Sequence, residues 1–190
     1  MHPTDEKRLL RDGIVERIKR MTDSQRAAES RSLCRRLLPA IPKGSVVAGF
    51  MPFVTEPDLR MLLKELLARG DRIVLPRFEK GLIFREATDL KELTPGELNT
   101  LEPPADAPIL DPETLSVALV PARGYTLKGQ RLGRGNGGYD RWIRLQRKLN
   151  PRTKFIGVCF DCQVVPDVPM EEHDEMVDAI ATARGITECH

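Results

Sequence analysis

The chain has 190 residues, of which 41% are hydrophobic and 31% charged, and its formal net charge is +2 at pH 7. This composition is ordinary for a globular protein, and we expect one domain over residues 1–190. The longest apolar runs are a few residues long and the N-terminal segment is charged, which excludes a membrane span and a signal peptide. Four cysteines do not indicate a disulfide scaffold, so we expect a cytoplasmic protein.

The N-terminal part of the chain predicts two helices. The first begins after Thr4, because apolar residues recur at near-helical spacing and form one buried stripe. The stripe consists of Leu10, Ile14, Ile18 and Met21. Lys7 and Arg11 are four residues apart and therefore share one face of this helix. The second helix begins with a capping box, Thr22-Asp-Ser-Gln25, and stops near Pro39.

The middle of the chain alternates short strands with one more helix. Residues 46–51 predict a buried strand, and Pro57 suits the first turn of a third helix that ends just before Gly70. The inward-facing residues of this helix are Leu59, Leu62, Leu63 and Leu66. Residues 73–76 and 82–85 are predicted to be short strands.

The C-terminal half predicts three more strands and a helix. Five prolines between positions 95 and 112 exclude a helix or a central strand, so we expect a surface crossing there. Strands are predicted at 116–120, 155–160 and 179–183, with a helix at 139–149. Strands that alternate with helices predict an α/β fold, namely three layers with a mostly parallel sheet flanked by helices.

The most informative segment is residues 131–140, Arg-Leu-Gly-Arg-Gly-Asn-Gly-Gly-Tyr-Asp. Glycine lets the backbone approach a ligand closely, the planar fork of arginine matches phosphate, and a carboxylate is a ligand that Mg²⁺ prefers. The segment follows a predicted strand and leads into a helix N-terminus, where α/β folds bind anions. It predicts an exposed site for a polyphosphate and Mg²⁺, and hence an enzyme that uses ATP.

Positive charge gathers around this segment. From Arg123 to Lys154 there are ten lysines and arginines and one acid, Asp140. Such a zone attracts phosphates, a polyglutamate tail or nucleic acid. Four of the cations lie on the predicted helix, where a solvated face is an equally good interpretation: Arg141, Arg144, Arg147 and Lys148.

Three short motifs carry less weight. Gly133-x-Gly135-x-x-Gly138 has the letters of a dinucleotide fingerprint, but it does not directly follow its strand. Gly124-x4-Gly129 is followed by Gln-Arg and is therefore no Walker A motif. Cys159-Phe-Asp-Cys162 lacks a second pair of zinc ligands, so we expect Cys159 to be a core residue and Cys162 to be incidental.

The acidic cluster near the C-terminus and Glu56 can each be interpreted in two ways. One acid of the cluster at 171–178 could complete a Mg²⁺ site with Asp140, or the cluster could be a solvated loop, and spacing does not choose among its members. Glu56 follows a buried strand, where its carboxylate could bind a heterocycle with N–H donors or stabilise a helix N-terminus.

Several short patterns occur in order along most of the chain. They are Lys7-x-x-Leu-Arg11, the turn from Pro52 to Glu56, Leu75-Pro76-Arg77, Val120-Pro121, the glycine segment 129–141, Gly157, Gln163 and His173-Asp174. In this order they resemble the 5-formyltetrahydrofolate cyclo-ligases, also called methenyltetrahydrofolate synthetases. The resemblance implies a small-molecule enzyme that uses ATP and Mg²⁺ to close 5-formyltetrahydrofolate, which can carry a polyglutamate tail, into 5,10-methenyltetrahydrofolate. It also implies a monomer without nucleic-acid or membrane partners.

The resemblance also implies roles for individual residues. The contacts to ATP are Lys7, Arg11, Arg131, Gly133, Arg134, Gly135, Asn136, Gly137 and Tyr139. Asp140 and Asp174 would hold Mg²⁺, and Arg134 and Asp140 would act in catalysis. Met51, Glu56 and Gly138 would line the substrate pocket, with Glu56 hydrogen-bonded to the pteridine ring.

The chain departs from the family pattern at three places. Gly138 replaces an aromatic residue that helps to hold the folate, and Asn136 stands where lysine is common. The segment 121–126 reads Pro-Ala-Arg-Gly-Tyr-Thr in place of Pro-Gly-x-x-Phe-Asp. We expect Gly138 and this segment to border the folate pocket. Two alternatives therefore stay open: a paralogue that acts on another molecule or only binds folate, and an RNA-binding module.

Overall fold

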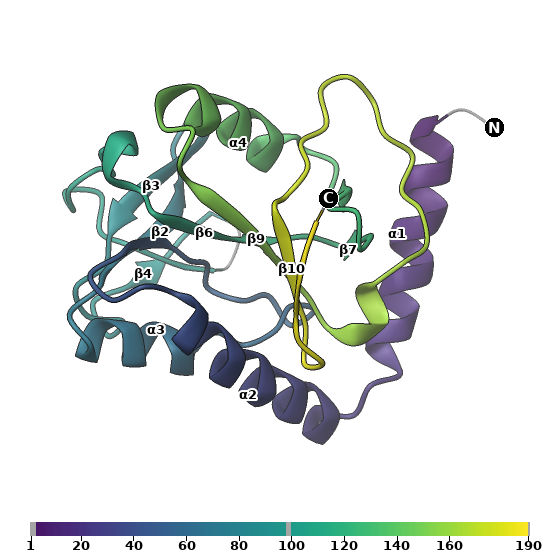
Figure 1. Cartoon of the computed structure of the whole chain (residues 1–190), viewed down its shortest axis with the longest axis horizontal. Helices are drawn as coiled ribbons and strands as arrows, with labels where there is room; N and C mark the ends of the chain where they lie inside the picture. Colours follow the sequence, from purple (N-terminus) through teal and green to yellow (C-terminus); the bar gives the residue numbers. More distant parts are fainter. Residues whose placement is uncertain (1–2, 98–99, 190) are drawn as a thin grey trace.

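The computed structural model describes residues 3–97 and 100–189. Within these residues a seven-stranded sheet has the order β11-β10-β9-β6-β1-β2-β3 (Figure 1). Its strands are β1 (Val46–Ala48), β2 (Arg72–Phe78), β3 (Leu82–Glu86), β6 (Val117–Pro121), β9 (Lys154–Val158), β10 (Ala179–Ala181) and β11 (Ile186–Glu188). The five central strands, β10, β9, β6, β1 and β2, pair in parallel, and β11 and β3 are antiparallel strands at the two edges. The predicted α/β fold with a mostly parallel sheet is confirmed.

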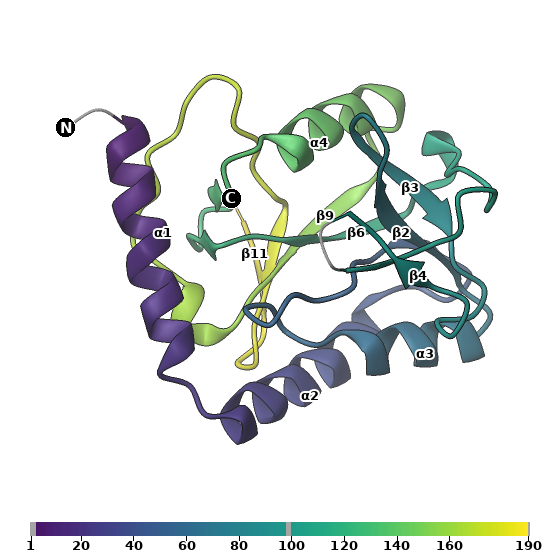
Figure 2. The same cartoon turned by 180° about the vertical axis from the view of Figure 1, so that it is seen from behind.

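Helices cover both faces of the sheet, as Figures 1 and 2 show. They are α1 (Pro3–Lys19), α2 (Asp23–Ala40), α3 (Arg60–Ala68) and α4 (Gly138–Leu149). Successive strand residues point to opposite faces, so Val47 packs with α2 and α3 while Val46 packs with α4. None of the described helices is long and apolar enough to cross a membrane.

Helix α1 stands beside the sheet and packs on residues near the C-terminal ends of the strands. Ile14 and Ile18 are buried against Phe160, Val165 and Val168. The segment that contains these residues runs along α1 in both views (Figures 1 and 2). Of the predicted stripe, Ile14 and Ile18 are fully buried and Leu10 is partly buried, while Met21 lies beyond the end of α1. The buried residues fix the polar face of the helix beside the loops that follow β6 and β9.

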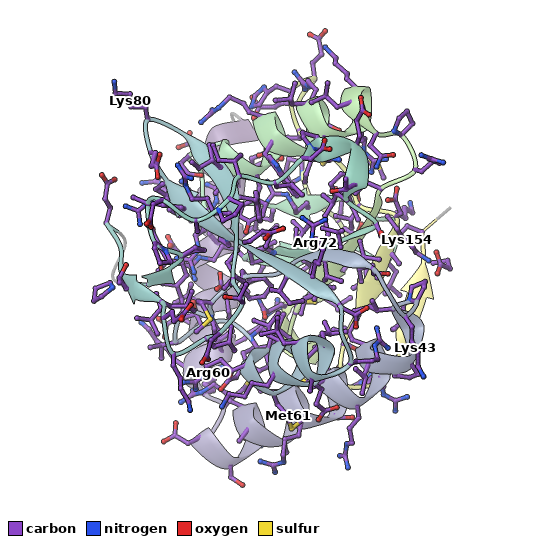
Figure 3. The ribbon with its side chains drawn as sticks, turned by 90° about the vertical axis from the view of Figure 1, so that its left-hand side faces the viewer. Lys43, Arg60, Met61, Arg72, Lys80 and Lys154 are labelled. Atoms are coloured by element: carbon purple, nitrogen blue, oxygen red, sulfur yellow. The ribbon has the colours of Figure 1, made fainter. Side chains whose placement is uncertain are left out.

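Short ribbons carry the loops between the main strands. β7 (Gly124–Tyr125) pairs with β8 (Arg131–Leu132), and β4 (Thr94–Pro95) pairs with β5 (Leu101–Glu102). Single 3₁₀ turns form η1 (Pro112–Thr114) and η2 (Asp161–Gln163). The β2–β3 hairpin lies at the opposite side of the sheet, where Arg72 pairs with Glu86 and Lys80 points outward from the turn (Figure 3).

The structure corrects several predicted boundaries. The third helix begins at Arg60 and not at Pro57, because residues 53–56 form a closed turn in which the Glu56 carboxylate accepts from the Phe53 amide at 3.0 Å. The strand predicted at 46–51 ends at Ala48, and the chain then bends toward the site. β11 and the β7–β8 ribbon were not predicted, because strands of two or three residues carry no periodic signal.

Gly157 is the point where β9 packs against Tyr125, in the segment that follows β6. A Cβ at this position would lie 2.7 Å from the Tyr125 ring, and the Tyr125 hydroxyl is held by a 2.6 Å hydrogen bond to the Val120 carbonyl. The ring is fully buried and cannot move aside. Glycine is therefore required at this contact.

We predict that Gly157→Ala lowers the free energy of unfolding by ~1–3 kcal/mol, because the added methyl group overpacks a closed site. The matched control is Gly13→Ala in α1, where nothing lies within 4 Å of the added Cβ; this change should stabilise the protein by ~1 kcal/mol. Urea unfolding measures both variants. Equal stability of Gly157→Ala and the wild type would contradict the contact.

Candidate active site

Two cavities lie on either side of the loop at residues 133–137. The polar cavity, of about 160 Å³, lies between this loop, α1 and residues 171–174. The apolar cavity, of about 70 Å³, lies between the same loop, the turn at 50–56 and β2. Both cavities are lined by Arg131, Gly133, Gly137 and Asp140. One loop therefore forms the wall that separates them.

The loop is built between β8 and the N-terminus of α4. Gly135 and Gly137 have φ values of 108° and 64°, a region that residues with a Cβ seldom adopt. Gly137 is the N-cap of α4 and offers no side chain to the first amides of the helix. Asn136 accepts from the Gly138 amide at 3.2 Å. The helix therefore presents its amide groups and the positive end of its dipole to the cavities.

A buried ion pair holds the loop in place. The Arg131 guanidinium and the Asp140 carboxylate form an ion pair at 2.7 Å, with 3% and 12% of the two side chains exposed. Arg131 also donates to the Pro121 carbonyl at 3.4 Å, and the Glu175 amide donates to Asp140 at 3.3 Å. The expectation that Asp140 lies in an exposed loop is therefore wrong, because the pair turns its side chain inward from the first turn of α4.

Lys7 connects α1 to the acidic segment across the polar cavity. Its ammonium group donates to Asp174 at 2.5 Å and to Glu171 at 2.6 Å. Burial acts to lower the pKa of Lys7, but the hydrogen bonds and charges of the two acids outweigh it and raise that pKa. Burial acts to raise the pKa of Asp174, but the bonds from Lys7 and the Glu171 amide lower it. The cluster is therefore ionised at neutral pH.

Carboxylate oxygens suitable for a metal line the same cavity. Among the described residues, Glu171, His173 and Asp174 place three ligand atoms within 4.8 Å of one another. Asp140 is not part of that group but borders the same cavity as Asp174. Hard oxygen ligands of this kind suit Mg²⁺. Two other acids of the segment form hydrogen bonds with side chains of α4: Glu175 accepts from Arg144 at 2.9 Å, and Asp178 accepts from Arg147 at 3.0 Å.

Two arginine side chains lie on opposite sides of the loop, that of Arg11 from α1 and that of Arg134 from the loop itself. Arg11 donates to the Gly133 carbonyl at 2.8 Å from the side of the polar cavity. Arg134 donates to Glu56 at 2.7 Å on the side of the apolar cavity. Its guanidinium carbon lies 3.7 Å from the centre of the Phe53 ring. The structure thus brings together all the site residues that the sequence predicts, around these two cavities.

The altered segment at 121–126 is placed differently from the expectation. Pro121 borders the apolar cavity, but residues 122–126 do not. Thr126 is buried and its hydroxyl accepts from the amides of Lys128 and Gln130. Gly138 and Asn136 do border the apolar cavity. The changes at 125 and 126 therefore alter the β7–β8 ribbon and not the pocket wall.

Sequence reasoning missed one residue of the site, Phe53, and one cation near it, Arg123. Phe53 lies between two predicted pocket residues, Met51 and Glu56, and that position was an available signal. Arg123 donates to Thr55 at 2.7 Å. Burial and the charge of Arg134 lower the pKa of Arg123. No sequence pattern distinguishes it from the other cations of the basic zone.

The cysteines take no part in the site. Cys34, Cys159, Cys162 and Cys189 are all free. Cys159 is fully buried in the core beside Phe155, and burial raises the pKa of its thiol well above the usual range. The prediction that Cys159 is a core residue is confirmed.

The family model described as the 5-formyltetrahydrofolate cyclo-ligase family matches residues 3–183. The chain belongs to this family. It is 31% identical over 182 residues to the 5-formyltetrahydrofolate cyclo-ligase of Escherichia coli (strain K12), covering 92% of this chain and 99% of that protein. A cyclo-ligase of Mycolicibacterium smegmatis is 30% identical over 191 residues, with 93% and 94% covered.

A solved structure agrees with the fold. The 5,10-methenyltetrahydrofolate synthetase of Aquifex aeolicus superposes with a TM-score of 0.82 at 26% identity, covering 96% of this chain and 92% of that one. The family assignment and the α/β architecture are therefore consistent over nearly the whole chain.

We predict that Lys7→Met lowers the free energy of unfolding at pH 7 by ~2 kcal/mol, because Asp174 loses its buried counter-charge. The lowered pKa values of Asp174 and Glu171 make this contribution complete above their ordinary values of 3.8 and 4.5. It is lost as the pH falls through the lower folded values, so the difference between variant and wild type shrinks in acid.

Urea unfolding at pH 7 and pH 3 measures this difference. The matched control is Lys19→Met at the end of the same helix, whose partner Glu16 is exposed; its stability should stay close to that of the wild type. A destabilisation by Lys7→Met that is the same at both pH values would contradict the ion cluster.

Proposed function

We propose that the protein catalyses the ATP- and Mg²⁺-dependent cyclisation of 5-formyltetrahydrofolate to 5,10-methenyltetrahydrofolate, with release of ADP and phosphate. The observation that carries this proposal is the pair of cavities with one shared wall. A polyphosphate on the polar side and a heterocycle on the apolar side would meet at Gly133 and Gly137. Phosphoryl transfer between two bound molecules requires this kind of alignment.

The polar cavity suits the nucleotide phosphates. Lys7 and Arg11 supply positive charge from α1, and the loop supplies backbone amides at the start of α4. Arg131 forms an ion pair with Asp140. It would therefore act on the phosphates only through its positive charge and by shaping the wall of the cavity. Asp140 and Asp174 would hold Mg²⁺, which when bound neutralises phosphate charge and orients the phosphates.

The apolar cavity suits the reduced pteridine. Phe50, Met51, Pro76, Phe78 and Tyr139 give it apolar walls. Glu56, whose side chain is 4% exposed, is a single buried acceptor for the N–H edge of the ring. Most binding pockets combine apolar walls with a few placed polar groups in this way.

The chemistry needs alignment and positive charge and no covalent nucleophile. The formyl oxygen attacks the γ-phosphorus and ADP leaves, which converts a poor leaving group into a good one. N10 then attacks the formyl carbon and the ring closes, and loss of the N10 proton and of phosphate gives the methenyl product. Arg11, Arg134 and the loop amides would stabilise the charge that develops on the transferred group.

Two observations weigh against the alternatives. The aromatic residues near the basic zone pack on the core: Trp142 is partly buried and stacks on Phe84 at 4.2 Å, and Tyr125 is fully buried. They offer no platform for bases, which disfavours an RNA-binding module. A paralogue with another substrate is disfavoured by the intact Met51–Glu56 turn beside the loop. We further propose a single-domain, monomeric, cytoplasmic enzyme without nucleic-acid or membrane partners.

We predict that Arg134→Ala and Asp140→Asn each lower kcat by about a hundredfold or more, because the first removes a cation that would stabilise the transferred group and the second removes a carboxylate that would hold Mg²⁺. Asparagine is chosen at 140 because it keeps an acceptor beside Arg131, whereas alanine would leave this buried cation with the long bond to the Pro121 carbonyl. The rise in methenyltetrahydrofolate absorbance with 5-formyltetrahydrofolate, ATP and Mg²⁺ measures turnover. Arg144→Ala on the outer face of α4 is the control and should retain activity. Near-normal turnover in either site variant, with an unchanged thermal transition, would contradict the assignment.

We predict that ATP raises the thermal transition only when Mg²⁺ is present. A ligand that binds only the native state stabilises it by RT ln(1 + [L]/Kd), or about 2.7 kcal/mol at a hundredfold excess over Kd. Thermal melts with ATP, with ATP plus Mg²⁺ and with NAD test this. A shift with NAD and none with MgATP would favour a dinucleotide site instead.

We predict that Gly138→Tyr tightens 5-formyltetrahydrofolate binding by ~1 kcal/mol, because it restores an aromatic contact. Gly138 does not have a positive φ, and an added Cβ would first meet Asn136 at 3.5 Å, so the backbone accepts the change. Calorimetry on both proteins measures the affinity. Equal or weaker binding by a variant that melts normally would mean that the pocket is built for a different ligand.

A further inference from the structure

The guanidinium of Arg134 lies inside the apolar cavity and not toward the phosphate side. It contacts two groups there, the Glu56 carboxylate at 2.7 Å and the face of the Phe53 ring at 3.7 Å. Glu56 is fixed by a second hydrogen bond, from the Phe53 amide at 3.0 Å. A planar cation is thus held at its edge by a buried carboxylate and on its face by an aromatic ring.

These two contacts are the ones that the heterocycle of the proposed substrate needs. The 2-amino-4-oxo ring of a reduced pteridine presents an N3–H and an exocyclic amine, which are two parallel donors on one planar N–C–N unit. A guanidinium presents the same unit. The carboxylate that accepts from Arg134 can therefore accept from the ring edge, and the Phe53 face can stack on the ring plane.

Arg134 and the heterocycle compete for the place between the Glu56 carboxylate and the Phe53 ring. The apolar cavity that remains beside Arg134 has a volume of about 70 Å³. An apolar cavity of about 150 Å³ holds one benzene ring, and a pteridine is bicyclic. A pteridine therefore does not fit in this cavity while Arg134, with 31% of its side chain exposed, occupies the place beside Glu56. A larger hollow of about 490 Å³ also borders Met51, Phe53 and Glu56, but Arg134 does not line it.

We propose that Phe53 is a further substrate-binding residue whose face holds the pteridine, and that Arg134 occupies this place until substrate and nucleotide displace it. The inference rests on the proposed function. Arg134 lies between Gly133 and Gly135, which both border the polar cavity, so nucleotide phosphates attract the released guanidinium across the wall. Nucleotide and folate therefore favour each other's binding, by the same factor in either order.

Calorimetry of 5-formyltetrahydrofolate binding without nucleotide tests the proposal. Arg134→Met removes the competing guanidinium, so this variant should bind the folate several-fold more tightly than the wild type. Loss of a positive charge next to an anionic ligand would by itself weaken binding, so the expected tightening has the opposite sign. Adding Phe53→Leu to Arg134→Met should weaken binding by about three- to tenfold through loss of the ring contact.

A non-hydrolysable ATP analogue with Mg²⁺ tests the coupling. It should tighten folate binding to the wild type and leave the affinity of Arg134→Met unchanged. Arg123→Met is the matched control, since Arg123 carries a nearby guanidinium that bonds to Thr55 and not to Glu56; it should not tighten binding.

Equal or weaker binding by Arg134→Met would overturn the occupation of the pocket, as would similar tightening by Arg123→Met. An unchanged affinity after Phe53→Leu would overturn the stacking role. If none of these folded proteins binds 5-formyltetrahydrofolate, while MgATP still raises the thermal transition, the folate substrate of the proposed function fails, and the inference fails with it.

Discussion

Beneath the glycine loop a guanidinium and a carboxylate, those of Arg131 and Asp140, meet at 2.7 Å and are almost fully shielded from water. A buried pair of this kind adds little to stability, because the cost of removing both charges from water offsets their attraction. Its effect is on position. Arg131 belongs to β8 and Asp140 to the first turn of α4, so the pair fixes both ends of the loop between them. Either charge alone would be strongly unfavourable, and the loop therefore has one path.

Two other cations of the site are also paired with carboxylates, whereas Arg11 donates to the Gly133 carbonyl. Lys7 is held by Asp174 and Glu171, and Arg134 is held by Glu56. Such pairs keep charged groups in defined positions before a ligand arrives, which is the condition for electrostatic catalysis. They also mean that ligands must compete with internal partners. Ligand binding in this site is therefore an exchange of ion pairs and not the filling of an open pocket.

The sequence contains enough to predict the layers and the location of the site. Hydrophobic periodicity predicts the helices, and the parallel sheet places the ends of β1 and β6 side by side, which brings the turn at Glu56 near the glycine loop. The partners within the site were beyond sequence reasoning. Lys7 and Asp174 are 167 residues apart, and Arg134 and Glu56 are 78 residues apart, so no local pattern relates them. The burial of Asp140 follows from the β7–β8 ribbon, which is too short to leave a periodic signal.

In the proposed reaction the shared wall brings the γ-phosphate of ATP against the formyl oxygen of the folate, and isotope tracing follows that oxygen. 5-Formyltetrahydrofolate labelled with ¹⁸O in the formyl group is converted with unlabelled ATP and Mg²⁺, and the inorganic phosphate is analysed by mass spectrometry. Because the formyl oxygen leaves on the transferred phosphoryl group, we expect one ¹⁸O atom in each phosphate released. Phosphate without the label, formed while the folate is cyclised, would contradict it.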